Sequence, residues 1–149
     1  VLSTVHTNDA LSTVVRLVDM GVEPFLVASS VKCVISQRLV KKICPKWKKE
    51  NKVDLRDNLL LQTHLDKAYK GIGCAECNQT GYQGRTAVFE IILVDSKLQE
   101  LIAKRAPMDD LKVYAREQDM RMLREEVLEL INQGITTVDE GVRILYTVD

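Results

Sequence analysis

Apolar residues recur every three or four positions soon after the chain begins, which predicts a helix of about three turns. They are Leu11, Val14, Val15 and Val18. Asn8 and Asp9 precede this helix and suit its cap, because short polar side chains accept hydrogen bonds from the free N–H groups of a first turn. Gly21 suits the stop of the helix. Pro24 suits the first turn of a second short helix through Ala28.

Three stretches predict strands instead. Residues 1–5 are largely apolar and end at His6-Thr7-Asn8-Asp9, so we expect a short buried strand there. The chain begins within this predicted strand, with no initial Met and no polar residues before it, so we also expect it to be a piece of a longer protein. Residues 31–43 are rich in Val and Ile and hold no Gly or Pro, so we expect a strand, with a helix as the alternative. In the strand, Cys33 is expected to be a buried thiol. Residues 86–94 predict the third strand.

The chain from residue 96 onward predicts helices. Ser96 with Gln99 and Thr137 with Glu140 have the spacing of capping boxes, and Gly134 suits a stop between them. We expect the apolar stripes of these helices to be core and subunit-packing positions; they are Leu111, Tyr114, Leu123, Val127 and Leu130.

Composition shifts after residue 44. Residues 45–70 are polar and basic, and they predict an exposed insertion with one helix. A cluster of lysines surrounds Trp47: Lys41, Lys42, Lys46, Lys48, Lys49 and Lys52. Such a patch suits nucleic acid or an anionic membrane surface, but it is more often a solvated face, which we favour. The 149 residues carry a net charge of zero, so we predict no specific nucleic-acid partner.

Two motifs carry candidate chemistry. His6 follows a predicted strand and precedes a capped helix, which is where open α/β sheets bind ligands. A histidine there can hydrogen-bond a phosphate or a polarised water, or it can simply cap the strand end. The second motif is Cys74-x-x-Cys77, in a chain with four cysteines and no secretory signal, so it indicates a metal or redox feature rather than disulfides.

Taken together, several stretches resemble the superfamily of bacterial secretion and pilus-assembly ATPases. They are residues 1–10, 16–26, 36–40, 73–77, 80–86, 89–90 and 134–137. The cysteine knuckle points to type IV pilus assembly or type II secretion rather than pilus retraction. The resemblance implies an α/β fold: the C-terminal part of a RecA-like P-loop ATPase core, with a small cysteine-knuckle insertion and a C-terminal helical tail. We expect residues 1–43 to end the RecA-like core, 44–95 to form the zinc-ribbon-like knuckle and returning strand, and 96–149 to form the helical subdomain.

The resemblance also implies a setting. Family members are cytoplasmic hexamers at the inner face of the bacterial plasma membrane, where peripheral membrane contact is expected. They use ATP and Mg²⁺ to drive an inner-membrane platform protein. His6 matches the histidine that faces the nucleotide's terminal phosphate, so it is the expected catalytic and nucleotide-binding residue. Gln37 and Arg38 match a family-typical Gln-Arg-Leu, and we favour a structural role for Arg38.

The phosphate-binding groups of such ATPases are missing from the sequence. No Gly-x-x-x-x-Gly-Lys-Ser/Thr occurs, and we expect no Walker B acid in this chain. Phosphoryl transfer depends on those groups for positioning and charge stabilisation. We therefore expect the longer parent protein to be the enzyme and this chain alone to be inactive.

A metal site is implied as well. The family's knuckle carries two Cys-x-x-Cys pairs, whose four thiolates suit tetrahedral zinc. Here Cys74 and Cys77 are intact, but Trp47 stands where the partner of Cys44 would be. The expected ligands are therefore Cys44, Cys74 and Cys77, with His64 as the fourth. The alternative is a knuckle without metal, in which Trp47 fills the space.

A competing hypothesis from another class is a stand-alone zinc-ribbon-like interaction module without catalysis. The cysteine pair and the lysines support it, whereas the His6 motif counts against it, because a binding module would not need that motif. In either case Gly81 and Gly84 are expected to shape the turn, and Arg85 is expected to make a structural salt bridge.

Overall fold

The computed structural model describes residues 1–146, which divide into two compact units. The first unit comprises Val1–Gln37 and Phe89–Leu123, and the second comprises Arg38–Val88 and the chain from Arg124 onward. Each unit thus combines separate segments, whereas the three expected regions are consecutive. Those regions stay a prediction about organisation, and the last three residues of region 96–149 lie outside the described residues.

The helices of the first unit follow the predicted pattern closely. They are α1 (Ala10–Asp19), α2 (Pro24–Ser30), α4 (Ser96–Ala103) and α5 (Met108–Glu117). Asp9 caps α1 as expected, because its carboxylate accepts from the Ser12 N–H at 2.6 Å. The cap of α4 differs from the prediction: Asp95, not Ser96, accepts from the Leu98 N–H at 2.8 Å.

Two paired strands, β1 (Cys33–Ile43) and β4 (Tyr82–Leu93), contribute to both units. The predicted strands over 31–43 and 86–94 are therefore confirmed. Side chains alternate along β1, so that Val34 and Val40 are buried while Cys33 is exposed. The expectation of a buried Cys33 was wrong, because Cys33 lies on the opposite face of the strand from Val34.

The predicted strand over residues 1–5 is not formed. These residues have no regular secondary structure and are exposed. A strand needs the N–H and C=O groups of a neighbour, and the sheets among residues 1–146 pair only β1 with β4 and β2 with β3.

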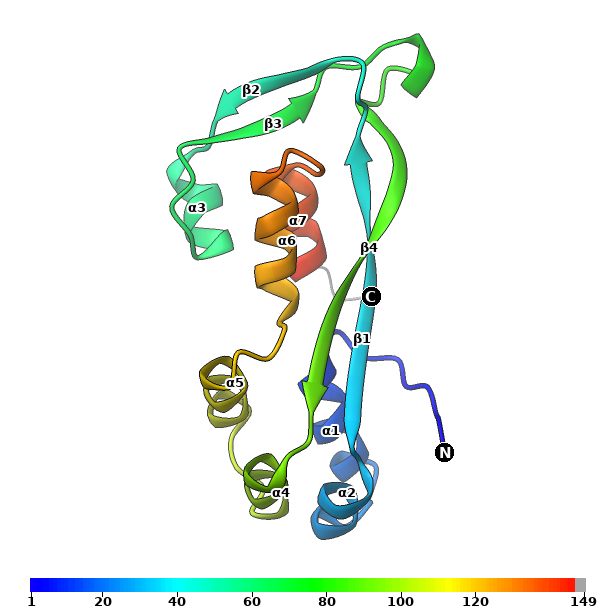
Figure 1. Cartoon of the computed structure of the whole chain (residues 1–149), viewed down its shortest axis with the longest axis vertical. Helices are drawn as coiled ribbons and strands as arrows, with labels where there is room; N and C mark the ends of the chain where they lie inside the picture. Colours follow the sequence, from blue (N-terminus) through cyan, green and yellow to red (C-terminus); the bar gives the residue numbers. More distant parts are fainter. Residues whose placement is uncertain (147–149) are drawn as a thin grey trace. The chain divides into compact units, whose positions relative to one another are not determined.

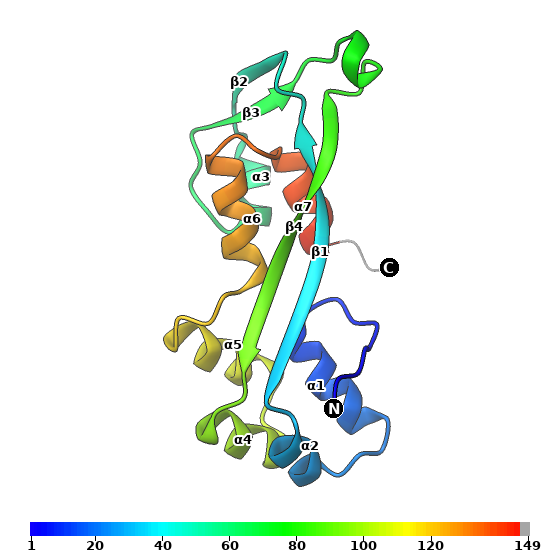
Figure 2. The ribbon, with the colours of Figure 1, turned by 45° about the vertical axis from the view of Figure 1, so that its right-hand side comes forward.

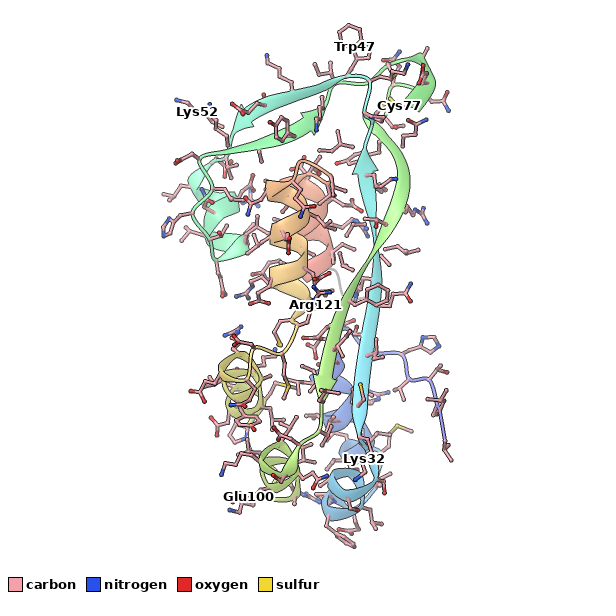
Figure 3. The ribbon with its side chains drawn as sticks, viewed as in Figure 1. Lys32, Trp47, Lys52, Cys77, Glu100 and Arg121 are labelled. Atoms are coloured by element: carbon pink, nitrogen blue, oxygen red, sulfur yellow. The ribbon has the colours of Figure 1, made fainter. Side chains whose placement is uncertain are left out.

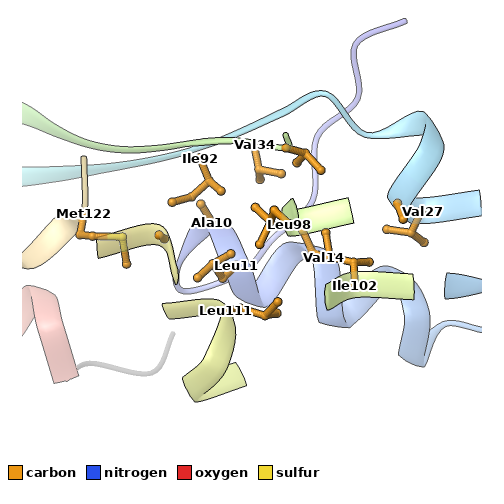
Figure 4. Close-up of a cluster of buried hydrophobic side chains, with 13 residues drawn as sticks. Ala10, Leu11, Val14, Val27, Val34, Ile92, Leu98, Ile102, Leu111 and Met122 are labelled. Atoms are coloured by element: carbon orange, nitrogen blue, oxygen red, sulfur yellow. The ribbon is translucent and has the colours of Figure 1, made fainter. Parts of the chain in front are cut away.

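The core of the first unit is a cluster of apolar side chains from its helices and the nearby ends of the strands (Figure 4). Helix α2 lies beside α4, and α1 contacts both α5 and α2 (Figures 1 and 2). The cluster consists of Ala10, Leu11, Val14, Val27, Ala28, Val34, Ile92, Val94, Leu98, Ile102, Leu111, Ala115 and Met122.

The second unit contains the insertion. Its elements are β2 (Lys48–Lys52), α3 (Leu55–Leu61), β3 (Lys67–Gly71), a 3₁₀ turn (Ala75–Cys77), α6 (Leu123–Asn132) and α7 (Val138–Tyr146). The single helix expected within residues 45–70 is confirmed. The β2–β3 hairpin was not predicted; its strands are antiparallel, with Lys48 opposite Gly71 and Lys52 opposite Lys67.

The turn between α6 and α7 is tied to β1. The Ile43 N–H donates to the Ile135 carbonyl at 2.8 Å. The Thr136 hydroxyl donates to the Lys41 carbonyl at 2.8 Å, and the Lys41 N–H donates to the buried Glu140 carboxylate at 3.0 Å. These bonds satisfy backbone groups of β1, whose only strand partner among residues 1–146 is β4.

Among residues 1–146, no helix combines the length and hydropathy that crossing a membrane requires.

The core of the first unit predicts a difference between two leucine substitutions. Leu11→Ala should lower the free energy of unfolding by about 3 kcal/mol, because Leu11 is fully buried and leaves a cavity. Leu26→Ala is the matched control, since Leu26 is 46% exposed and should cost less than about 1 kcal/mol. Urea unfolding of both variants measures the two values, and equal costs would contradict the assigned core.

Candidate functional site

Three cysteine thiols meet in the second unit. Cys44 follows β1 directly, Cys74 precedes the 3₁₀ turn, and Cys77 is the last residue of that turn. Figure 3 labels Cys77. The Sγ atoms of Cys44 and Cys74 are 3.8 Å apart, and those of Cys74 and Cys77 are 3.6 Å apart. All three sulfur atoms lie within 4.8 Å of one another, and Cys44 and Cys77 are buried.

Backbone contacts bring these cysteines together. The Cys44 N–H donates to the Gly81 carbonyl at 2.9 Å, and the Ile72 N–H donates to the Trp47 carbonyl at 3.0 Å. A Cβ on Gly71 would lie 2.0 Å from the Gly81 oxygen, so the chain segments before and after the cysteine turn approach too closely for any side chain at Gly71. Gly81, with φ +77°, shapes the turn as expected.

The thiols differ in acidity. Burial opposes ionisation of Cys77, but hydrogen bonds from the backbone of Cys74 and Gly81 and from the thiols of Cys74 and Cys44 outweigh it, so the pKa of Cys77 falls to about 7. For Cys74, a backbone hydrogen bond at Cys77 favours the thiolate, yet burial and the two neighbouring thiols prevail and raise its pKa. The cluster therefore holds one thiol that ionises readily near neutral pH.

The spacing of the sulfur atoms fits a metal. Tetrahedral zinc with Zn–S bonds of about 2.3 Å places its sulfur ligands about 3.8 Å apart. The Cys44–Cys74 and Cys74–Cys77 separations of 3.8 and 3.6 Å match this spacing, and the third lies within 4.8 Å. Three of the four expected ligands, Cys44, Cys74 and Cys77, are thus in place to hold zinc, and the group would cross-link the end of β1 to the turn before β4.

The fourth expected ligand, His64, is not brought into this group. His64 is exposed and precedes β3 at the end of the hairpin where Lys67 faces Lys52. Figure 3 shows Lys52 at the opposite end of the hairpin from Cys77. Trp47 does not fill the knuckle either, since its side chain is 62% exposed.

His6 lies in the first unit, four residues before α1. It is exposed, and the chain after it is held by local hydrogen bonds. The Thr7 and Thr13 hydroxyls lie 2.6 Å apart, and the Thr7 hydroxyl donates to the Asp9 carbonyl at 3.1 Å. These bonds and the Asp9 cap fix the start of α1, so His6 is presented to solvent from a defined helix end.

Glu90 is a residue to which the sequence analysis gave no role. It is 3% exposed, and its carboxylate accepts from the Ala10 N–H, at the start of α1, at 2.6 Å. Burial raises the pKa of Glu90, the Ala10 N–H opposes that rise, and Asp9 adds to it. A signal was available, because Glu90 is the only charged residue in the predicted strand 86–94. Glu90 thereby anchors the helix that follows His6.

Gln37, Arg38 and Arg85 stay predictions. Gln37 and Arg85 are exposed, and Arg38 is half-buried.

The described residues form a mixed α/β fold, and comparison with solved structures finds it in a motor protein. The pilus retraction motor PilT, in a crystal structure with bound ADP, is similar with a TM-score of 0.59 and 18% sequence identity. The similarity covers 97% of this chain and 32% of that one. At this identity the likeness speaks to the fold alone.

The sequence itself identifies the family. Residues 1–143 match the family described as Type II/IV secretion system protein, and the chain belongs to that family. This confirms the resemblance to the secretion and pilus-assembly ATPases that the motifs predicted.

Curated relatives come from both secretion and pilus systems. The chain is 42% identical over 144 residues to the type II secretion system protein HxcR of Pseudomonas aeruginosa, covering 97% of this chain and 28% of that protein. It is 40% identical over 147 residues to the type II secretion system ATPase E of Vibrio cholerae (97% and 29%). It is 41% identical over 145 residues to the type IV pilus assembly ATPase PilB of Thermus thermophilus (94% and 16%). The chain thus spans less than a third of the length of these relatives.

Glu90 predicts a pH dependence of stability. Its pKa in the folded chain lies above the ordinary 4.5, so its ionisation costs the fold stability as pH rises from 4.5 through the raised value. Glu90→Gln keeps an acceptor for Ala10 without the charge. The difference in unfolding free energy should therefore shift in favour of the variant with rising pH, by at most about 1.4 kcal/mol per pH unit.

Urea unfolding between pH 4 and pH 8 measures this difference. Glu125→Gln, at an exposed position on α6, is the control and should show no comparable trend. A difference between Glu90→Gln and the parent chain that does not change with pH would contradict the assignment.

The close approach of Gly71 to Gly81 predicts the effect of a substitution on stability. Gly71→Ala should lower the free energy of unfolding by about 3 kcal/mol, because the new methyl group would meet the Gly81 backbone. Gly84→Ala is the control: Gly84 has φ +73° but an added Cβ would approach only the Lys42 side chain, at 3.5 Å, so about 1 kcal/mol is expected. Denaturant unfolding compares the two, and a smaller cost for Gly71→Ala would refute the close contact.

Proposed function

We propose that the chain is the C-terminal part of a cytoplasmic hexameric ATPase that powers type IV pilus assembly or type II protein secretion. The observation that carries this proposal is the family match over residues 1–143, with relatives that are named ATPases in both systems. The match extends well beyond the cysteines, so it favours the ATPase over a stand-alone zinc-ribbon-like module. In this proposal the parent works at the inner face of the plasma membrane on an inner-membrane platform protein.

ATP and Mg²⁺ bind mainly to groups outside this chain. The sequence offers no phosphate loop, a group that positions the nucleotide and neutralises its charge in such ATPases. Asp95 directly follows the apolar run 91–94, but its carboxylate is engaged by the Leu98 N–H and by the Tyr114 hydroxyl. The 149-residue chain alone therefore neither binds ATP tightly nor hydrolyses it.

His6 is the residue of this chain that acts at the nucleotide. Its role is to sense or position the terminal phosphate during hydrolysis, through a hydrogen bond from its imidazole. Its exposure, and the anchoring of the next helix by Asp9 and Glu90, support this role, because a positioning group needs a rigid base and an accessible ring.

Zinc is the cofactor proposed for the second unit. Cys44, Cys74 and Cys77 would hold it, and the metal would act as a structural cross-link rather than in hydrolysis. The match between the measured sulfur separations and the spacing of zinc ligands supports this assignment.

A chimera tests the role of the chain. The matching segment of the Vibrio cholerae ATPase E would be replaced by this chain, and ATP hydrolysis by the purified protein measured. The chimera should hydrolyse ATP, and His6→Ala should reduce kcat about a hundredfold, because a positioned proton-transfer or phosphate-contacting group is lost.

The chain has two histidines, so His64→Ala is the matched control and should leave kcat unchanged. The isolated 149-residue chain should show no turnover above buffer. Full activity of the His6→Ala chimera would refute the role of His6, and robust turnover by the isolated chain would refute its dependence on the missing groups.

A further inference from the structure

The three thiols can fill three of the four ligand positions of a tetrahedral metal site, so one position remains without a cysteine. Structural zinc sites are almost always four-coordinate. Within residues 1–146, the group of His, Cys, Asp and Glu side chains around these sulfur atoms contains only Cys44, Cys74 and Cys77. The fourth ligand must therefore be a side chain of another type, or a molecule from solvent.

Gln83 brings a ligating side-chain oxygen close to one of the three cysteines, Cys44. The Gln83 Oε1 is 3.9 Å from the Cys44 Sγ. With a Zn–S bond of about 2.3 Å and a Zn–O bond of about 2.1 Å, tetrahedral geometry places a sulfur and an oxygen ligand about 3.6 Å apart. The amide oxygen is thus within a few tenths of an ångström of ligand spacing from Cys44.

The backbone beside Gln83 is held against the cluster. The Gly81 carbonyl, two residues earlier, accepts from the Cys44 N–H at 2.9 Å, which holds this part of the chain against Cys44. Gln83 is exposed at the start of β4, so its side chain has rotamer freedom to close the remaining gap.

The other candidates are less well placed. Trp47 has no ligating atom and is 62% exposed. His64 precedes β3, on the side of the hairpin where Lys67 faces Lys52.

We propose that Gln83 supplies the fourth ligand, through its amide oxygen, to a metal ion held by Cys44, Cys74 and Cys77. The inference rests on the proposed zinc site. A neutral oxygen replaces a fourth thiolate, so the site carries one negative charge fewer than a four-cysteine site. The oxygen is also a weaker donor to zinc than a thiolate, so metal exchanges more readily here than at four cysteines.

Cobalt titration of the full 149-residue chain tests this ligand set, because Co²⁺ takes the place of zinc and absorbs visibly. Thiolate-to-cobalt absorption counts the sulfur ligands, and the ligand-field bands report the fourth ligand. Gln83→Ala should leave the thiolate absorption per bound cobalt unchanged, alter the ligand-field bands and weaken binding about tenfold. Gln83→Glu retains an oxygen at this position and should restore affinity.

Two controls sharpen the result. Gln133→Ala, at an exposed position beyond α6, and His64→Ala should both bind cobalt as the parent chain does. A Gln83→Ala variant with the parent's spectrum and affinity would overturn the inference while leaving the metal site intact. So would a changed spectrum in His64→Ala. Absence of thiolate-to-cobalt absorption in the parent chain would overturn the metal site and the inference together.

Discussion

The pairing of β1 with β4 is the interaction on which both units depend. Each unit closes its apolar interior with a different part of the same two strands. Val34 and Ile92 belong to the core of the first unit, whereas Val40 and Val88 are buried in the second. A substitution that breaks the pairing of β1 with β4 therefore destabilises both cores. A large-to-small substitution in one helix instead leaves a cavity in the core of that unit alone.

The cysteine knuckle does not depend on an apolar core of this kind. Gly71 and Gly81 meet there backbone against backbone, so closely that a Cβ on Gly71 would lie 2.0 Å from the Gly81 oxygen. Small elements without a core of their own commonly gain stability from a metal, because binding free energy becomes folding free energy. In this family member the Cys44–Cys74 and Cys74–Cys77 sulfur separations are those of zinc ligands, although the segment after Cys44 holds no second cysteine.

A periodic pattern of apolar and polar residues arises where an element buries one face and exposes the other, so such a pattern can predict only elements of that kind. Helix α1 followed from its helical period, whereas strand β1 followed from its Val and Ile content and from the absence of Gly and Pro. The strand Lys48–Lys52 is exposed throughout, so nothing in its pattern indicated a hairpin. The expected strand over residues 1–5 lacked a partner, and Cys33 was misplaced because strand alternation was not applied to it. In the site, the resemblance grouped Cys44 with the cysteine pair, but the position of His64 depends on the unpredicted hairpin.

The claim that three cysteines of this chain form a working metal site is tested most directly by elemental mass spectrometry of the protein. The chain would be purified without added metal or a histidine tag, beside a Cys74→Ser variant. The account predicts about one zinc per chain in the parent and a marked loss in the variant. A zinc content near zero in the parent, with Cys44, Cys74 and Cys77 all reactive toward a thiol reagent, would contradict it.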